Sequence, residues 1–379
     1  MSWGSSWMMS KGNFSCLRRS MLLRLSTRSQ GGTSSWAPVG WVAVMVPLLR
    51  PWPLRGSLLT FLHYFLDYPT AHRRPCQGPG HPPLARCRLL QFGRPVPHVY
   101  TNGIVTFYED ARPGGRTDVP TVVLVHGYSA DLRLWDDTVP ALLEAGFRVV
   151  RYDVRGHGRS LVPPSGYGFP VYAADLADLL DRLNVDRPIS EDLAVGAVHL
   201  VGLSMGGGIA LQFALEHPER VRSLTLVDST LPGFTYSPEF ERDIEEMVAV
   251  ARREGPRAAL ERVWLSHPIF DGVRRFPERF ARLREMVLSY PGRDLLAEAE
   301  PPSPVQVADR LQEIAAPALV LVGELDLPDF HLVAQVLAAN LPRARLEVLA
   351  DCGHVPPLER PEEFNRRLLA FLREVEASG

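Results

Sequence analysis

The sequence predicts an α/β fold in which helices cover both faces of a mostly parallel sheet. From about residue 98 onward, short aliphatic and β-branched runs alternate with segments of helical periodicity. The strand-like runs are apolar at successive positions, which is typical of strands buried on both faces between two helical layers. Right-handed crossovers then place the carboxyl ends of these strands at one edge of the sheet. Ligand sites of such sheets lie at that edge.

The first predicted elements form a β-hairpin. Asn102-Gly103 separates the strand-like runs 99–101 and 104–108, and this dipeptide is a strong signal for a two-residue turn. The other elements follow in chain order. Strands are predicted at 121–125, 147–152, 198–203, 224–227, 318–322 and 346–349, and helices through 142–143 and at 171–183, 207–216, 333–339 and 362–374.

Residues 231–305 interrupt this alternation. Their pattern indicates several helices punctuated by proline and glycine, so we expect a helical cap inserted between two parts of a core, 96–230 and 306–379. The cap segment contains 11 arginines and 13 acidic residues. Because these charges nearly cancel, the arginines indicate a solvated helical surface and give no argument for an anionic substrate.

The first part of the chain has a different composition. Residues 1–98 carry 12 basic side chains and one acid, Asp67, whereas the rest of the chain carries 29 basic and 42 acidic ones. We interpret residues 1–95 as a basic leader that is disordered or lies upstream of the true start. An arginine- and serine-rich, acid-poor composition also fits an organelle-targeting peptide. Its longest apolar stretches are far shorter than the roughly 20 residues of a membrane span, so we expect no membrane segment and a cytoplasmic protein.

The composition predicts no metal, cofactor or nucleic-acid partner. Three of the four cysteines lie within residues 1–95, and Cys352 is expected to be a small buried packing residue. No cluster of histidine, cysteine and acidic residues has metal-ligand spacing, and the basic residues are scattered instead of forming a patterned stripe. The expected partner is a small-molecule substrate, and the sequence does not indicate an oligomeric state.

The most specific chemical signal is Gly202-Leu203-Ser204-Met205-Gly206-Gly207, between a predicted strand and a predicted helix. A G-x-S-x-G segment at this position predicts a nucleophile elbow, a strained turn that lifts the serine hydroxyl clear of the sheet. The following helix directs its positive N-terminal end toward the same place. Ser204 is therefore the candidate nucleophile.

A serine nucleophile requires a base, which an acid must orient. His354 follows the last predicted strand and Asp326 follows the strand at 318–322, so the order Ser, Asp, His along the chain is the one expected of this architecture. The identity of the acid stays open, because Asp329 and Asp228 also follow strands of the predicted sheet. Asp326 is the first choice and Asp228 the first substitute.

Acyl transfer also needs donors for the developing oxyanion. The backbone N–H of Met205, the residue after the nucleophile, is one candidate. The second candidate is the N–H of Tyr128, in the loop that follows the strand at 121–125. For His126, in the same loop, we expect a hydrogen bond that fixes the turn and no catalytic role.

These separated motifs resemble the α/β-hydrolase superfamily over about residues 98–376. The motifs are His126-Gly127-Tyr128, Asp153-x-x-Gly156-His157-Gly158-x-Ser160, Gly202-x-Ser204-x-Gly206-Gly207, Gly323-x-x-Asp326 and Gly353-His354-x-Pro356-x-Leu358-Glu359-x-Pro361. The resemblance implies the α/β-hydrolase fold and a Ser-His-Asp triad, with residues 153–160 as a structural turn beside the site. It looks most like the esterase, lactonase, cofactor-free haloperoxidase and carbon–carbon hydrolase branches. Epoxide hydrolases and haloalkane dehalogenases carry an aspartate where this chain has Ser204.

We therefore predict a serine hydrolase that cleaves a small carboxylic ester or lactone through an acyl-enzyme. A carbon–carbon hydrolase of a ring-cleavage product uses the same triad and is the first alternative. An acyltransferase, which requires a water-excluding pocket, and a non-catalytic ligand-binding protein of the same fold are the others. The cap lining distinguishes these alternatives, and Trp135, Phe234, Trp264 and Phe270 are candidates for its walls or for the core.

Overall fold

The computed structural model describes residues 97–116, 118–184, 196–298 and 306–378. The chain divides into two units, Met1–Arg88 and Leu89–Gly379, and everything below concerns the second. The predicted leader at 1–95 and the end of the predicted cap segment lie outside the described residues. Within the described part of the chain, no helix combines the length and the hydropathy needed to cross a bilayer.

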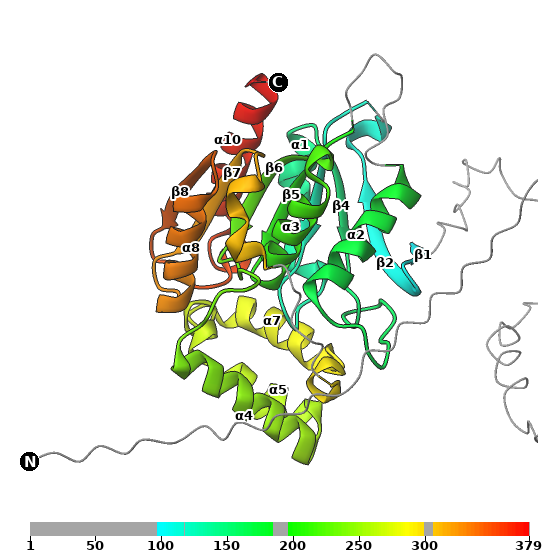
Figure 1. Ribbon diagram of the computed structural model, residues 1–379. Coiled ribbons are helices and arrows are strands. Elements are labelled where there is room, and N and C mark those ends of the chain that lie inside the picture. The colour runs from blue at the N-terminus through cyan, green and yellow to red at the C-terminus, as the bar shows by residue number, and fades with distance from the viewer. Residues whose placement is uncertain (1–96, 117, 185–195, 299–305, 379) are drawn as a thin grey trace, which may run out of the picture. The chain divides into compact units, whose positions relative to one another are not determined.

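An eight-stranded sheet forms the centre of this unit (Figure 1). Its strands are β1 (His98–Thr101), β2 (Ile104–Ala111), β3 (Thr121–Val125), β4 (Arg148–Tyr152), β5 (Val198–Leu203), β6 (Val221–Val227), β7 (Ala318–Gly323) and β8 (Ala344–Leu349). Their order in the sheet is β1-β2-β4-β3-β5-β6-β7-β8. Strands β1 and β2 pair antiparallel to their neighbours and the other pairings are parallel. The predicted hairpin is confirmed, with Asn102 and Gly103 both at positive φ.

Helices cover both faces of this sheet, as predicted. Helices α2 (Phe169–Leu183), α3 (Met205–Glu216) and α8 (Pro328–Asn340) pack on one face, and α1 (Val139–Glu144) and α10 (Pro361–Ser378) on the other (Figure 1). Strand β3 contacts both layers, because side chains alternate along a strand. Val122 and Leu124 join the cluster that contains α10, whereas Val123 and Val125 join the cluster that contains α2 and α3.

Several elements begin earlier or end later than the sequence patterns indicate. Helix α8 starts at Pro328, five residues before the predicted start, since proline fits the first turn of a helix, where its missing N–H is not needed. The short helix α9 (Pro356–Glu359) has no periodic signal of its own. Further single turns of 3-10 helix lie at Pro113–Gly115 (η1), Leu132–Trp135 (η2), Pro218–Arg220 (η3), Trp264–Ser266 (η4), Pro268–Phe270 (η5), Asp294–Leu296 (η6), Val307–Asp309 (η7) and Leu311–Glu313 (η8).

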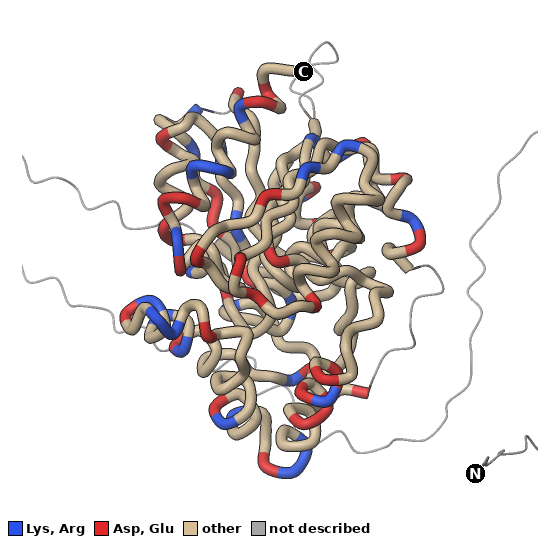
Figure 2. The backbone as a smooth tube through the Cα atoms, turned by 90° about the vertical axis from the view of Figure 1, so that its left-hand side faces the viewer, with Lys and Arg blue, Asp and Glu red and all other residues tan. Residues whose placement is uncertain are grey.

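The helices between β6 and β7 form a separate layer beyond the sheet, at the lower end of the molecule in Figure 1. They are α4 (Pro238–Glu254), α5 (Pro256–Arg262), α6 (Asp271–Arg274) and α7 (Pro277–Ser289). Basic and acidic positions are interspersed along this layer (Figure 2). Exposed pairs such as Arg242 with Glu239 account for much of its charge, as expected of a solvated helical surface.

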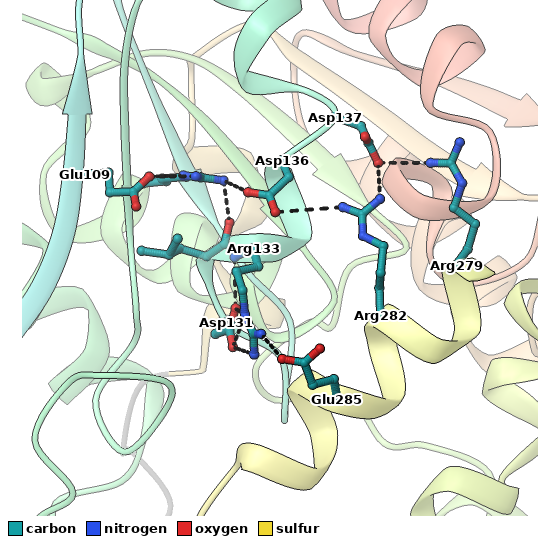
Figure 3. Close-up of polar contacts among 10 residues, drawn as sticks. Glu109, Asp131, Arg133, Asp136, Asp137, Arg279, Arg282 and Glu285 are labelled. Carbon is teal, nitrogen blue, oxygen red and sulfur yellow. Dashed lines mark hydrogen bonds and ion pairs between the residues drawn. The ribbon is translucent and has the colours of Figure 1, made fainter. Parts of the chain in front are cut away.

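Ion pairs connect helix α7 to the core (Figure 3). Arg279 and Arg282 both donate to the same oxygen of Asp137, at 2.9 and 2.7 Å, just before helix α1. One turn further along α7, Glu285 accepts a hydrogen bond from Arg133 of η2 at 2.6 Å. The cap is thus attached to the core by charged contacts as well as by the apolar packing between them.

Candidate active site

Ser204 occupies a strained turn between β5 and α3. Its φ is 52° and its ψ is −115°, in a region that non-glycine residues rarely adopt and that costs about 1–3 kcal/mol. The glycines on either side permit this turn. A Cβ on Gly202 would collide with the carbonyl oxygen of Gly206, and a Cβ on Gly206 would collide with the carbonyl oxygen of Val125. The structure therefore gives the segment the geometry of a nucleophile elbow.

His354 and Asp326 form a buried hydrogen-bonded pair. The Nδ1–H of His354 donates to Oδ2 of Asp326 at 2.7 Å, and both side chains are almost completely excluded from solvent. The N–H of Leu327 donates to the other carboxylate oxygen at 2.7 Å. With Nδ1 protonated, the Nε2 atom of His354 is the acceptor that a general base needs. The sequence predicted these two residues, and the structure brings them together.

Burial dominates the pKa values of this pair. It raises the pKa of Asp326 to about 7 and lowers that of His354 to about 4, because a charge is harder to maintain where water cannot solvate it. In the form that serves a base, the carboxylate is ionised and the imidazole neutral. That form takes up a proton when the pH falls through the higher of the two values.

The other two candidate acids have different partners. Asp329 accepts hydrogen bonds from the N–H of Ser237 at 2.6 Å and from its hydroxyl at 2.8 Å, so it fixes the start of α4 against α8. Asp228 accepts from the N–H of Gly323 at 2.8 Å, while its other oxygen is buried without a donor among the described residues. The structure therefore selects Asp326 as the partner of His354.

Asp228 nevertheless lies beside the selected pair. Ligand atoms of Asp228, Asp326 and His354 all lie within 4.8 Å of one another, a cluster that could in principle hold a metal ion. Since His354 donates its Nδ1–H to Asp326, we interpret the cluster as an acid–base pair with a neighbouring carboxyl group. Burial, and then the negative charge of Asp326, raise the pKa of Asp228 well above its usual value. The charged form of Asp228 is thus disfavoured beside a charged Asp326.

Glu359 holds the loop that carries His354, a role that the sequence did not reveal. Its buried carboxylate accepts hydrogen bonds from the N–H groups of Gly353 at 2.6 Å and Val355 at 2.9 Å, one residue before and one after the histidine. An acidic residue in an otherwise apolar turn shortly after the histidine was the available signal. Charge-assisted hydrogen bonds of this kind are roughly twice as strong as neutral ones.

The two predicted oxyanion donors border the same space as the candidate nucleophile and the candidate base. Tyr128, Met205, Ser204 and His354 all line one cavity. Among the described residues, neither the Tyr128 N–H nor the Met205 N–H donates a hydrogen bond. His126 has the expected turn-fixing geometry: its Nδ1–H donates to the Gly127 carbonyl at 2.8 Å, and its Nε2 accepts from the Val154 N–H at 2.9 Å.

The cavity has a volume of about 570 Å³ and lies between the core and the cap. Most of its lining is apolar, including Phe240, Ile244, Met247 and Val248 of α4. Volume and lining are both typical of a small-molecule site.

Two of the four candidate wall residues, Trp264 and Phe270, line this cavity. The other two do not. Trp135 packs against Phe364 in the core, and Phe234 packs against Tyr236. Cys352 is fully buried, as expected.

A comparison with known families agrees with this geometry. Residues 120–361 match the family model described as the alpha/beta hydrolase fold, which is well over half of the chain. The chain belongs to the α/β-hydrolase family. The predicted fold is confirmed by this match and by the sheet described above.

Individual relatives of this α/β hydrolase act on different substrates. A 2-hydroxy-6-oxononadienedioate/2-hydroxy-6-oxononatrienedioate hydrolase from Burkholderia vietnamiensis is 31% identical over 274 residues, which cover 70% of this chain and 90% of the relative. A thermophilic esterase from Thermogutta terrifontis is 30% identical with a TM-score of 0.60, covering 74% of this chain and 97% of the esterase. An enol-lactonase from Burkholderia xenovorans is 27% identical with a TM-score of 0.62, covering 73% and 100%. These three relatives are hydrolases.

Proposed function

We propose that this protein is a serine hydrolase that cleaves a small carboxylic ester or lactone through an acyl-enzyme. The observation that carries the proposal is the arrangement around the cavity. Ser204, on its strained elbow, and His354, oriented by Asp326, both open into one apolar space of substrate size. A nucleophile, a base and an acid that orients the base are the constellation needed for acyl transfer.

In the first half of the reaction, His354 Nε2 removes the hydroxyl proton of Ser204, and the serine oxygen attacks the carbonyl carbon. The N–H groups of Met205 and Tyr128 donate to the oxyanion of the tetrahedral intermediate. His354 then gives the proton to the departing alcohol oxygen, which leaves the acyl group on Ser204. Throughout, the Asp326 carboxylate keeps the imidazole proton on Nδ1 and stabilises the imidazolium.

In the second half, water replaces the alcohol. His354 takes a proton from the water molecule, whose oxygen attacks the acyl carbonyl. The same two N–H groups receive the second oxyanion. Return of the proton to the serine oxygen releases the carboxylic acid and restores the free enzyme. No step consumes a cofactor, so the chain's own residues supply every group that the reaction needs.

Esterase and lactonase relatives support this proposal, and one finding favours a second candidate. The relative named as a dienedioate hydrolase is as similar in sequence as the esterase is. A carbon–carbon hydrolase of such a compound is therefore the alternative function.

The direct test is hydrolysis of p-nitrophenyl esters from acetate to decanoate by the full-length protein. We expect turnover with an optimum chain length, because the cavity is apolar and of limited volume. Ser204→Ala should lower kcat at least about a thousandfold. Ser266→Ala, which removes an exposed cap hydroxyl, is the matched control and should leave kcat unchanged. Absence of turnover in a folded wild type would contradict esterase activity, and equal turnover by Ser204→Ala would contradict the proposed nucleophile.

A further inference from the structure

One part of the cavity differs from its apolar remainder. Asp294, in η6 at the end of the cap, lines the cavity together with Tyr128, Tyr167 and Tyr172. A fourth aromatic residue, Tyr290, lies behind this group and donates its hydroxyl to a carboxylate oxygen of Asp294. Its ring lies 5.3 Å from that of Tyr128.

The tyrosines are close enough to feel the charge of this carboxylate. Burial, and then the negative charge of Asp294, raise the pKa of Tyr128, Tyr167 and Tyr172. The hydroxyl of Tyr128 is buried, and no described residue forms a well-aligned hydrogen bond with it. Three tyrosines and one carboxylate thus line a single pocket.

No described basic side chain pairs with Asp294. Arg155 lies near Tyr167, but its guanidinium is bound by Asp175 through two hydrogen bonds of 2.7 and 2.6 Å. The basic residue of the cavity lining is Arg252, an exposed side chain of α4, and Glu298 adds a second acid to the lining. Burial raises the pKa of Asp294, so a charged carboxylate at this end of the cavity lacks an opposite charge that would favour it.

A carboxylate that shares an apolar cavity with three tyrosines has a defined ligand preference. A buried charge is costly unless it is both hydrogen-bonded and paired with an opposite charge. Tyr290 supplies a hydrogen bond to Asp294, and a cationic ligand would supply the opposite charge. Aromatic rings attract cations, by about 0.5 to 2 kcal/mol for each good contact. A carboxylate on the ligand would be repelled by Asp294 and would lose its hydration without compensation.

We infer that Asp294, Tyr128, Tyr167 and Tyr172 form a subsite that binds an ammonium group of the substrate and rejects carboxylates. This inference rests on the proposed function, because it assigns a charge to the ester or lactone that Ser204 cleaves. It also separates this protein from the relative whose named substrate is a dienedioate and therefore carries two carboxylate groups. The two proteins share the fold and differ in the charge they select.

Choline and its uncharged isostere test the subsite. In the isostere a tert-butyl group replaces the trimethylammonium group, so size and shape are matched and only the charge differs. Binding is measured by calorimetry on full-length Ser204→Ala protein, which requires no turnover. We expect choline to bind about tenfold more tightly than the isostere, which corresponds to about 1.4 kcal/mol. An analogue that carries a carboxylate in place of the trimethylammonium group should bind more weakly than choline or the isostere.

Asp294→Asn in the same background identifies the residue. It removes the charge but retains an oxygen that accepts from Tyr290, so the preference for choline should disappear while the isostere still binds. Glu246→Gln, which neutralises an exposed acid on α4, is the matched control and should retain the preference. Equal or tighter binding of the isostere to the parent protein overturns the inference. A choline preference that survives Asp294→Asn overturns the assignment to Asp294. Because binding is measured without catalysis, the subsite can be tested even if the protein does not hydrolyse the esters.

Discussion

Replacing Asp326 by asparagine tests which carboxyl group orients His354. The amide group of the introduced asparagine would donate to Nδ1, forcing the imidazole proton onto Nε2, where it blocks acceptance of the serine proton. The charge on Asp326 also stabilises the imidazolium. Two opposite charges about 4 Å apart attract by about 4 kcal/mol at the effective dielectric constant of about 20 that suits protein sites. That loss corresponds to about a thousandfold in kcat, and the wrong tautomer adds to it.

We therefore expect Asp326→Asn to lower kcat by about a thousand- to ten-thousandfold for p-nitrophenyl butyrate, with little change in KM. Asp228→Asn should lower kcat by less than about tenfold, because the Nδ1–H of His354 donates to Asp326 and not to Asp228. Circular dichroism checks that both variants are folded. Equal losses in the two variants would refute the assignment. The assignment would also be refuted if Asp326→Asn lowered kcat only slightly and the double variant Asp228→Asn/Asp326→Asn lowered it strongly, since Asp228 would then be replacing Asp326.

Three further predictions follow from the contacts around the site. kcat/KM should fall as the pH drops through about 7. Burial raises the pKa of Asp326 to about 7, and its protonation removes the acceptor of the His354 proton. A pH profile that stays flat well below that value would contradict this. Glu359→Gln should lower the free energy of unfolding, measured in urea, by about 1–3 kcal/mol and should also lower kcat, because one of the two backbone donors would face an amide N–H. Unchanged stability would contradict the role of Glu359. Asp137→Asn should lower the free energy of unfolding by no more than about 1 kcal/mol, because the side chains of its ion pairs with Arg279 and Arg282 are about one third exposed. The same change should reduce the salt dependence of Tm, and an unaltered salt dependence would show that these pairs do not attach the cap.

Local signals made part of the fold and the site predictable. These signals are the Asn102-Gly103 turn, the alternation of strands and helices and the glycines around Ser204. Each spans only a few residues, where backbone sterics determine the conformation. Strand ends supplied His354 and Asp326 as candidates, because parallel strands bring distant segments to one edge. The helical cap was predictable only as a break in the pattern.

Contacts between distant segments were not predictable in the same way. Asp228, Asp326 and Asp329 all follow strands, and nothing local distinguishes them. Each has a different partner, which is set by the pairing of β6 with β7 and by the packing of α4 on α8. Asp294 lies beside Tyr128 and Tyr172 only because the cap folds back over the sheet edge.

The sequence by itself predicted the candidate nucleophile, the candidate base and the class of fold, because their signals are encoded in backbone conformations of short segments. The tertiary structure decided which acid pairs with His354, how Glu359 fixes its loop and which polar groups line the cavity. Those properties depend on distances and burial between residues far apart in the chain, and only the packed sheet, helices and cap set them.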